Sequence, residues 1–255
     1  MKNISLIFFF FSLTIYCQKT YNGEIIYQDS FKTASNNIIS SYTLYFNNNF
    51  SFYILNTKAI PIKNNANGTL SSLIPEQSSK KPFYYKELNK ENVIFNSKTL
   101  LRQYTVNDNA LKFNWKIHND ERIIGKHTCR KATTEFRGRK YTAWFTSEIP
   151  VDYGPRKFNG LPGLILEIYD EKRIYRAYAK NLKINSGTEN FEKLLTDINL
   201  SNSITYEEFL SKRCDDAIKF KSLISSKMPR GSGNLKLNKV GSSENLEINS
   251  DVCLD

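Results

Sequence analysis

Residues 144–169 read WFTSEIPVDYGPRKFNGLPGLILEIY, and this stretch decides the fold. Three prolines and three glycines punctuate its middle, at Pro150, Gly154, Pro155, Gly160, Pro162 and Gly163. A loop with this composition loses less conformational entropy on folding than a flexible one, because each proline fixes its own backbone. Leu161, Pro162 and Gly163 predict a type II turn into a strand at residues 164–169, which begins with Leu164 and Ile165. That strand is apolar on both faces apart from Glu167, so we expect it to be covered on both sides.

Short runs rich in aromatic and β-branched residues flank this stretch and predict antiparallel strands. They fall at 24–27, 40–46, 50–55, 92–95, 100–106, 111–118, 129–136, 139–145 and 175–184. A two-residue turn at Arg137-Gly138 would place Lys131 opposite Trp144. A similar turn at residues 171–172 would place Arg176 opposite Glu167 and supply the counter-charge that a buried carboxylate needs.

The pattern changes to a helical one near the C-terminus. Thr205 stands three residues before Glu208, the spacing of a capping box, and apolar residues follow at helical spacing. This predicts a helix over about 205–226 and a mobile polar tail over 231–255. Residues 18–230 therefore read as one mainly antiparallel β domain. We expect a strongly curved sheet or open half-barrel with one C-terminal helix packed on it.

The central stretch also carries a family resemblance. The run GLPGLI at residues 160–165, preceded by W-F-T-x-E-I-P-x-x-x-G-P-x-x-F, resembles the signature of the GLPGLI family, and C-R-K-A-T-T at 129–134 resembles its upstream pattern. That family comprises exported proteins of Bacteroidota without an assigned activity. The similarity spans roughly residues 125–170. It implies a family and a compartment, and it supplies no catalytic residues.

The N-terminus predicts export. Residues 1–17 combine Lys2 with an apolar core of about a dozen residues, which is typical of a secretory signal peptide. Cleavage after Cys17 would release the chain to the periplasm or cell surface, and lipidation of Cys17 is the alternative. The 36 Lys and Arg outnumber the 25 Asp and Glu, which serves solubility or contact with an anionic surface such as membrane lipid headgroups or acidic glycans. We expect no nucleic-acid partner, because the chain is read as exported and shows no recognised nucleic-acid module.

Three hypotheses on function follow from the residues. An exported, non-enzymatic binding or accessory protein of the cell envelope would contact a peptide, a glycan or a partner protein through aromatic residues that converge on the stiff loop. The candidate ligand-binding residues are Trp144, Phe145, Tyr153, Phe158, Leu161 and Pro162. The alternative is that these residues form no ligand-binding groove and that the loop only supports the sheet.

The other two hypotheses invoke chemistry. A hydrolase acting on envelope polymers would use the acidic residues Glu148, Asp152 and Glu167 near the loop. A metal-handling protein would use His127 and Cys129, although zinc or copper needs three or four ligands. We expect no catalytic set, no bound metal and no cofactor. Cys214 and Cys253 are the candidate disulfide, because this bond would tie the tail to the helix.

Overall fold

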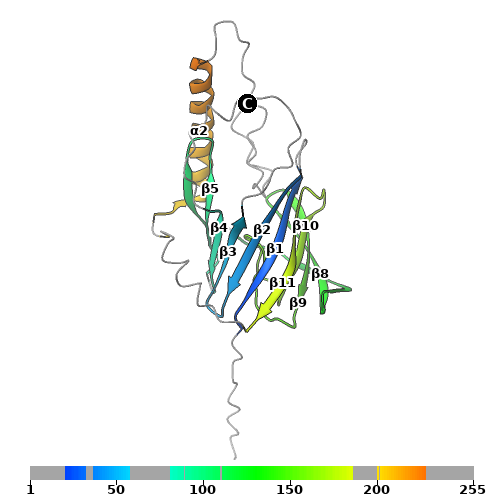
Figure 1. Ribbon diagram of the computed structural model, residues 1–255. Helices are drawn as coiled ribbons and strands as arrows, with labels where there is room; N and C mark the ends of the chain where they lie inside the picture. The colour runs from blue at the N-terminus through cyan, green and yellow to red at the C-terminus, as the bar shows by residue number, and fades with distance from the viewer. Residues whose placement is uncertain are drawn as a thin grey trace, which may run out of the picture.

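The computed structural model describes residues 21–32, 37–57, 81–88, 90–109, 111–185, 200 and 202–227. The expected signal peptide at 1–17 and polar tail at 231–255 lie outside these ranges. Within them the protein is mainly β, with one large sheet and a single helix near the C-terminus (Figure 1).

Twelve strands form this sheet in the order β12-β6-β5-β4-β3-β2-β1-β11-β10-β9-β8-β7. Their bounds are β1 Gly23–Lys32, β2 Asn37–Phe46, β3 Phe50–Thr57, β4 Phe83–Glu87, β5 Val93–Lys98, β6 Gln103–Asp108, β7 Lys116–Ile124, β8 His127–Phe136, β9 Arg139–Thr146, β10 Leu164–Asp170, β11 Tyr175–Ile184 and β12 Ile204–Thr205. The sheet is not closed, because β12 and β7 stand at its two ends.

The expectation of a wholly antiparallel sheet is wrong at one edge. All neighbouring strands pair antiparallel except β12, which runs parallel to β6. This strand has only two residues and enters from the connection that follows β11, so its direction is set by a long crossover instead of a hairpin. The sheet is therefore mixed.

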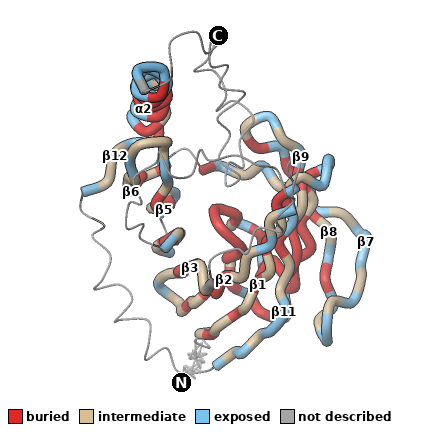
Figure 2. Tube along the Cα trace, turned by 45° about the horizontal axis from the view of Figure 1, so that its top comes forward, coloured by how far each residue is buried: buried red, intermediate tan, exposed pale blue. Residues whose placement is uncertain are grey.

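The two faces of the sheet differ in burial. In β1 the residues Ile25, Tyr27, Asp29 and Phe31 are buried, and the residues between them are half-buried. We call the face that carries these four residues the inner face and the opposite one the outer face. Figure 2 shows buried segments gathered along β1, β2 and β9.

The strand predicted after the Pro/Gly loop is confirmed. Residues Leu164–Asp170 form β10 between β9 and β11, and every one of them except Tyr169 is buried. The hairpin at Arg137-Gly138 is also confirmed, with Lys131 opposite Trp144. Both turn residues have positive φ, 46° and 78°, as a two-residue type I′ turn requires.

The register of the next hairpin differs from the prediction. Glu167 lies opposite Tyr178, because the connection between β10 and β11 has four residues, 171–174, instead of two. Arg176 still reaches Glu167 diagonally, with its Nε 2.7 Å from Oε1. The predicted ion pair therefore forms, although the strand register differs from the predicted one.

Two local predictions are wrong, and one strand was missed. The strand expected over 111–118 begins only at Lys116, and β4 at Phe83–Glu87 was not expected at all. The type II turn is absent as well. The Gly163 amide donates to Leu161 O at 2.8 Å, and the Leu164 amide donates to Ile149 O at 3.0 Å. The chain therefore turns within three residues and joins the strand sooner.

The C-terminal helix α2 spans Tyr206–Lys227 and contacts β6 and β12 at one end of the sheet (Figure 1). Its capping box is confirmed, because the Glu208 amide donates to Thr205 Oγ1 and the Thr205 amide donates to Glu208 Oε2, both at 3.1 Å. Cys214 on this helix is disulfide-bonded, and its expected partner Cys253 lies outside the described residues. In the part of the chain that the structure describes, no helix has the length and apolar character needed to cross a membrane.

Candidate functional site

The loop between β9 and β10, residues 147–163, lies against the inner face of the sheet; we call it the signature loop. Its course is set by backbone hydrogen bonds, including Gly160 N to Asp152 O at 3.1 Å and Ile165 N to Tyr153 O at 3.0 Å. A Cβ on Gly163 would lie 2.2 Å from Thr146 O, so only glycine allows this approach. The stiff loop predicted from the sequence is therefore a buried, closely packed segment.

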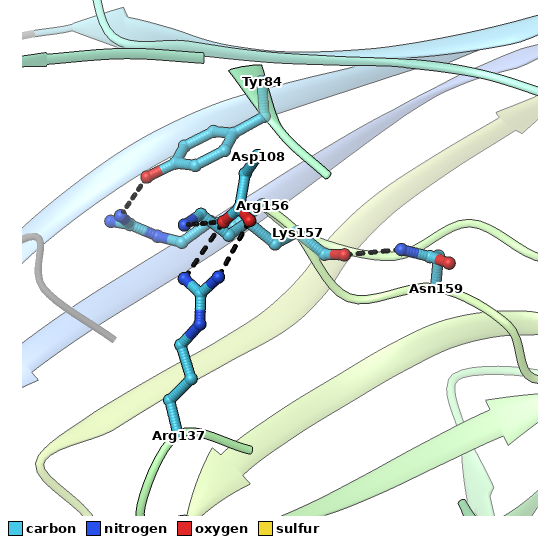
Figure 3. Close-up of polar contacts among 6 residues, drawn as sticks. All are labelled: Tyr84, Asp108, Arg137, Arg156, Lys157 and Asn159. Carbon is cyan, nitrogen blue, oxygen red and sulfur yellow. Dashed lines mark hydrogen bonds and ion pairs between the residues drawn. The ribbon is translucent and has the colours of Figure 1, made fainter. Parts of the chain in front are cut away.

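Arg156 anchors the signature loop to the sheet. Its side chain is 2% exposed, and its Nε donates to Asp29 Oδ2 at 2.7 Å. Its Nη1 donates to the Tyr84 hydroxyl at 2.9 Å, as Figure 3 shows. The Tyr53 hydroxyl donates to the other oxygen of Asp29. Arg156 has φ 56°, an uncommon conformation for a residue other than glycine. The buried ion pair holds it there, because a charge in the interior must keep its partner.

Aromatic rings surround the same guanidinium. The Arg156 Cζ lies between 5.1 and 5.6 Å from the centroids of four rings, those of Phe31, Tyr42, Tyr84 and Tyr175. Each lies within the range of a cation–π interaction, which strengthens when the cation is removed from water. The four rings come from β1, β2, β4 and β11. One loop residue therefore links strands across the middle of the sheet.

Lys157 makes a second buried ion cluster beside the first. Its Nζ lies 2.9 Å from Asp108 Oδ2, and Arg137 binds the same carboxylate through two nitrogens, at 2.8 and 3.0 Å (Figure 3). Asp108 is fully buried. Tyr206, the first residue of α2, lies against both cations, 4.0 Å from Arg137 Cζ and 4.8 Å from Lys157 Nζ.

This second cluster joins distant parts of the sheet. Asp108 ends β6, close to one end of the strand order, and Arg137 lies in the β8–β9 hairpin, close to the other. Their carboxylate and guanidinium are nevertheless in direct contact across the inner face. The sheet is therefore bent around the signature loop. Arg156 binds Asp29 and Tyr84 in the middle of the strand order, and the adjacent Lys157 binds Asp108 close to one end.

Burial and charge act differently on the pKa values of the two aspartates. Burial raises the pKa of Asp29, and the Arg156 guanidinium and the Tyr53 hydroxyl oppose that increase. Burial also acts to raise the pKa of Asp108, but the Lys157 ammonium and the Arg137 guanidinium outweigh it and lower the pKa below its ordinary value of 3.8. Two cations on one carboxylate therefore lower its pKa despite burial, whereas the single cation at Asp29 does not.

The Asp108 cluster predicts a pH-dependent contribution to stability. Because the folded-state pKa of Asp108 lies below 3.8, its carboxylate stabilises the fold above that pH, and this stability is lost as the pH falls through the lower folded-state pKa. Asp108→Asn should lower the free energy of unfolding by about 3 kcal/mol at neutral pH. The difference from the parent should shrink below about pH 4, in urea unfolding at pH 7, 5 and 3. Asp120→Asn, at an exposed carboxylate, serves as the control, and a difference that grows toward low pH would contradict this account.

The predicted ligand-binding residues do not form an open surface. Five of the six are at most 9% exposed, and only Pro162 reaches solvent. Phe158 packs between Tyr141 and Tyr175, with ring centroids 4.8 and 6.3 Å away. Trp144 lies on the outer face under Arg122, away from the others. Their binding role stays a prediction, which this burial does not favour.

The residues proposed for chemistry are each engaged elsewhere. Glu148 accepts from the Thr128 amide at 2.9 Å and lies 2.6 Å from His127 Nδ1, and these contacts lower its pKa. Asp152 pairs with Lys86 at 3.0 Å, and Glu167 pairs with Arg122 and Arg176.

The proposed metal ligands are no better placed. Burial raises the pKa of Cys129 to about 11, so its thiol stays protonated. Among the described residues, no three His, Cys, Asp or Glu side chains are arranged to hold a metal.

A groove lies on the outer face over β7 to β10; we call it the outer groove. Its volume is about 590 Å³, and its lining residues are Asn114, Lys116, Thr133, Thr134, Glu135, Lys140, Tyr141, Thr142, Tyr169, Glu171 and Arg173. The strand register places Lys116, Thr133, Thr142 and Tyr169 in one row across four strands. Arg173 covers the Tyr169 ring, with its Cζ 3.4 Å from the centroid.

Sequence reasoning missed both the buried anchors and the groove. Asp29 shares the period of Ile25 and Tyr27 along β1, which is a readable signal for a carboxylate on the buried face. Arg156 and Lys157, two charges between Pro155 and Phe158 in an apolar loop, were a second signal. The groove had no local signal, because its row of residues is assembled from four strands.

Comparisons with known proteins add little to this. Residues 133–167 match the family model described as "Protein of unknown function (Porph_ging)". The match lies inside the stretch 125–170 that resembles the GLPGLI family, includes the motif at 160–165, and does not itself confirm that family. No curated protein matches the chain.

Two solved structures of PNGF-II, in different crystal forms, are 18% identical to the chain, with TM-scores of 0.45 and 0.44. The alignments cover 73% and 81% of this chain but only 31% and 32% of the PNGF-II chains. The chain therefore spans about a third of their length, and TM-scores below 0.5 do not establish a common fold.

Proposed function

We propose that this chain is an exported, non-enzymatic binding or accessory protein of the cell envelope, and that it contacts its ligand at the outer groove. The observation that carries this proposal is that the two faces of the sheet differ in what they expose. The signature loop is enclosed on the inner face, whereas the outer face presents an open groove with hydroxyl groups, cations and a tyrosine.

The lining of the outer groove favours a polar ligand. Thr133 and Thr142 place hydroxyl groups on its floor, and Tyr169 combines an apolar ring with a hydroxyl. Lys140 and Arg173 lie among acidic neighbours, so the groove offers both donors and acceptors. A glycan or a polar peptide matches this lining better than an acyl chain, which would leave these groups without partners.

The Tyr169 side chain gives the test. The full chain, immobilised and incubated with an extract of the cell envelope, should retain a peptide or glycan that mass spectrometry identifies. Tyr169→Ala should reduce the retained amount by about fivefold or more, because truncating a central tyrosine removes much of the contact energy of a binding site. Tyr45→Ala, on the outer face of β2, is the matched control. Equal retention by Tyr169→Ala and the parent would contradict the proposal.

A further inference from the structure

We infer that the outer groove and the arginines beside it bind an acidic polysaccharide, a chain of sugars that carries carboxylate or sulfate groups. This inference rests on the proposed function and names the chemistry of its ligand. It is carried by three features of the outer face of β7 to β11: arginines over aromatic rings, an excess of positive charge, and cations without ion-pair partners among the described residues.

Three arginines lie over aromatic rings of this face. The Arg Cζ to ring centroid distances are 4.1 Å for Arg122 on Trp144, 3.4 Å for Arg173 on Tyr169 and 4.7 Å for Arg176 on Tyr178. The rings belong to the neighbouring strands β9, β10 and β11. Trp144, Glu167 and Tyr178 lie in one row, and Tyr169 lies opposite Arg176 in the next. Stacking restricts each guanidinium, so less entropy is lost when it binds an anion.

The acid groups on this face do not neutralise it. The groove and the arginine row together hold five cations and three carboxylates, which are Lys116, Arg122, Lys140, Arg173 and Arg176 against Glu135, Glu167 and Glu171. Glu167 is the carboxylate at the centre, and both Arg122 and Arg176 contact it, so two cations share one anion. Arg173, at the groove, forms no ion pair with any residue in the described ranges. The result is a row of planar cations whose free edges suit carboxylate or sulfate oxygens.

The groove lies beside this row on the same face. Lys116 and Lys140 line it, and neither pairs with an acidic group anywhere in the described part of the chain. Thr133 and Thr142 lie between them, and sugar hydroxyl groups are suitable partners for such side chains. A ligand with both anionic groups and hydroxyl groups along its length therefore matches the groove and the arginine row together.

The covered rings argue against the other polyanions. Proteins that bind single-stranded nucleic acid stack bases on accessible aromatic faces. Here the guanidinium groups occupy those faces, and Trp144 is only 9% exposed. A membrane surface would favour apolar side chains that enter the lipid, but this row consists of charged and hydroxyl-bearing residues.

Titration of the full chain with defined polymers tests the inference. Polygalacturonate supplies carboxylates, chondroitin sulfate supplies sulfates as well, and dextran supplies neutral sugar. We expect at least one acidic polymer to bind about tenfold more tightly than dextran, and its affinity to fall as the salt concentration rises. Arg173→Gln should weaken that binding about fivefold, since it removes one guanidinium from the groove at an exposed position.

Two double variants test whether the effect is specific to this surface and not a result of net charge. Arg173→Gln combined with Arg176→Gln should weaken binding more than either change alone. Lys98→Gln combined with Lys221→Gln removes the same charge from β5 and α2 and should leave the affinity unchanged. Circular dichroism confirms folding of each variant, and Arg173→Gln alone suffices if the double variant unfolds.

Every other outcome overturns the inference. Equal binding of dextran and the acidic polymers, lost in Tyr169→Ala but kept in Arg173→Gln, would show a neutral-glycan site and leave the proposed function standing. Equal or tighter binding of single-stranded DNA or anionic phospholipid vesicles would show a general polyanion surface. An absence of polymer binding refutes the inference. The proposed function would still be supported if the parent retained a peptide from envelope extract and Tyr169→Ala retained less of it.

Discussion

Replacing Arg156 with methionine is expected to lower the free energy of unfolding by about 3–5 kcal/mol, because it leaves the Asp29 carboxylate buried without a cation. Tyr84 loses the nitrogen that donates to its hydroxyl, and four rings lose the cation they surround. The signature loop would then keep its apolar contacts but lose its anchor on β1. Urea unfolding followed by tryptophan fluorescence measures the change.

Arg173→Met is the matched control for this prediction. Arg173 also has a positive φ, 54°, but its side chain is exposed and lies over the Tyr169 ring. Its replacement should cost less than about 1 kcal/mol. A loss below about 1.5 kcal/mol for Arg156→Met would show that the buried pair does not hold the loop.

Replacing Gly163 with alanine should destabilise the protein by about 3 kcal/mol or more, by a steric mechanism unrelated to charge. The new Cβ would lie 2.2 Å from Thr146 O and 2.6 Å from Thr146 C, both backbone atoms that cannot rotate away. Relief requires β9 and β10 to separate where the signature loop joins the sheet. The change is expected in the midpoint of thermal or urea unfolding.

Gly125→Ala separates the steric effect from the backbone effect. Gly125 has φ 61°, and a Cβ there would meet no atom within 4 Å. Only the left-handed backbone is then penalised, at about 1 kcal/mol. If the two alanine variants lose the same stability, the close approach of Gly163 to Thr146 does not constrain the loop.

The sequence predicts local features of this fold well. β10, the β8–β9 hairpin and the capped helix each depend on residues close together in the chain, and each forms where its pattern indicates. The register of the β10–β11 hairpin escaped prediction because it depends on the length of a turn, and two or four residues at 171–174 satisfy the local pattern equally. The parallel β12 depends on where a long connection returns, which no local pattern encodes.

The position of the signature loop, buried or exposed, was the least predictable feature. Its prolines, glycines and aromatic residues fit an exposed rim or an internal brace equally well. Its position is decided by Asp29 and Asp108, which lie 127 and 49 residues away from their partners Arg156 and Lys157. The outer groove is a similar case, since its lining is drawn from β7 to β10 and the following turn.

A double-mutant cycle on Asp29→Asn and Arg156→Met tests the central claim, that a buried ion pair holds the signature loop on the inner face. The free energies of unfolding of the parent, both single variants and the double variant give the coupling between the two side chains. The account predicts a coupling of at least about 2 kcal/mol, since removing Asp29 relieves the unpaired charge that Arg156→Met creates. Additive effects, with a coupling below about 0.5 kcal/mol, would contradict it.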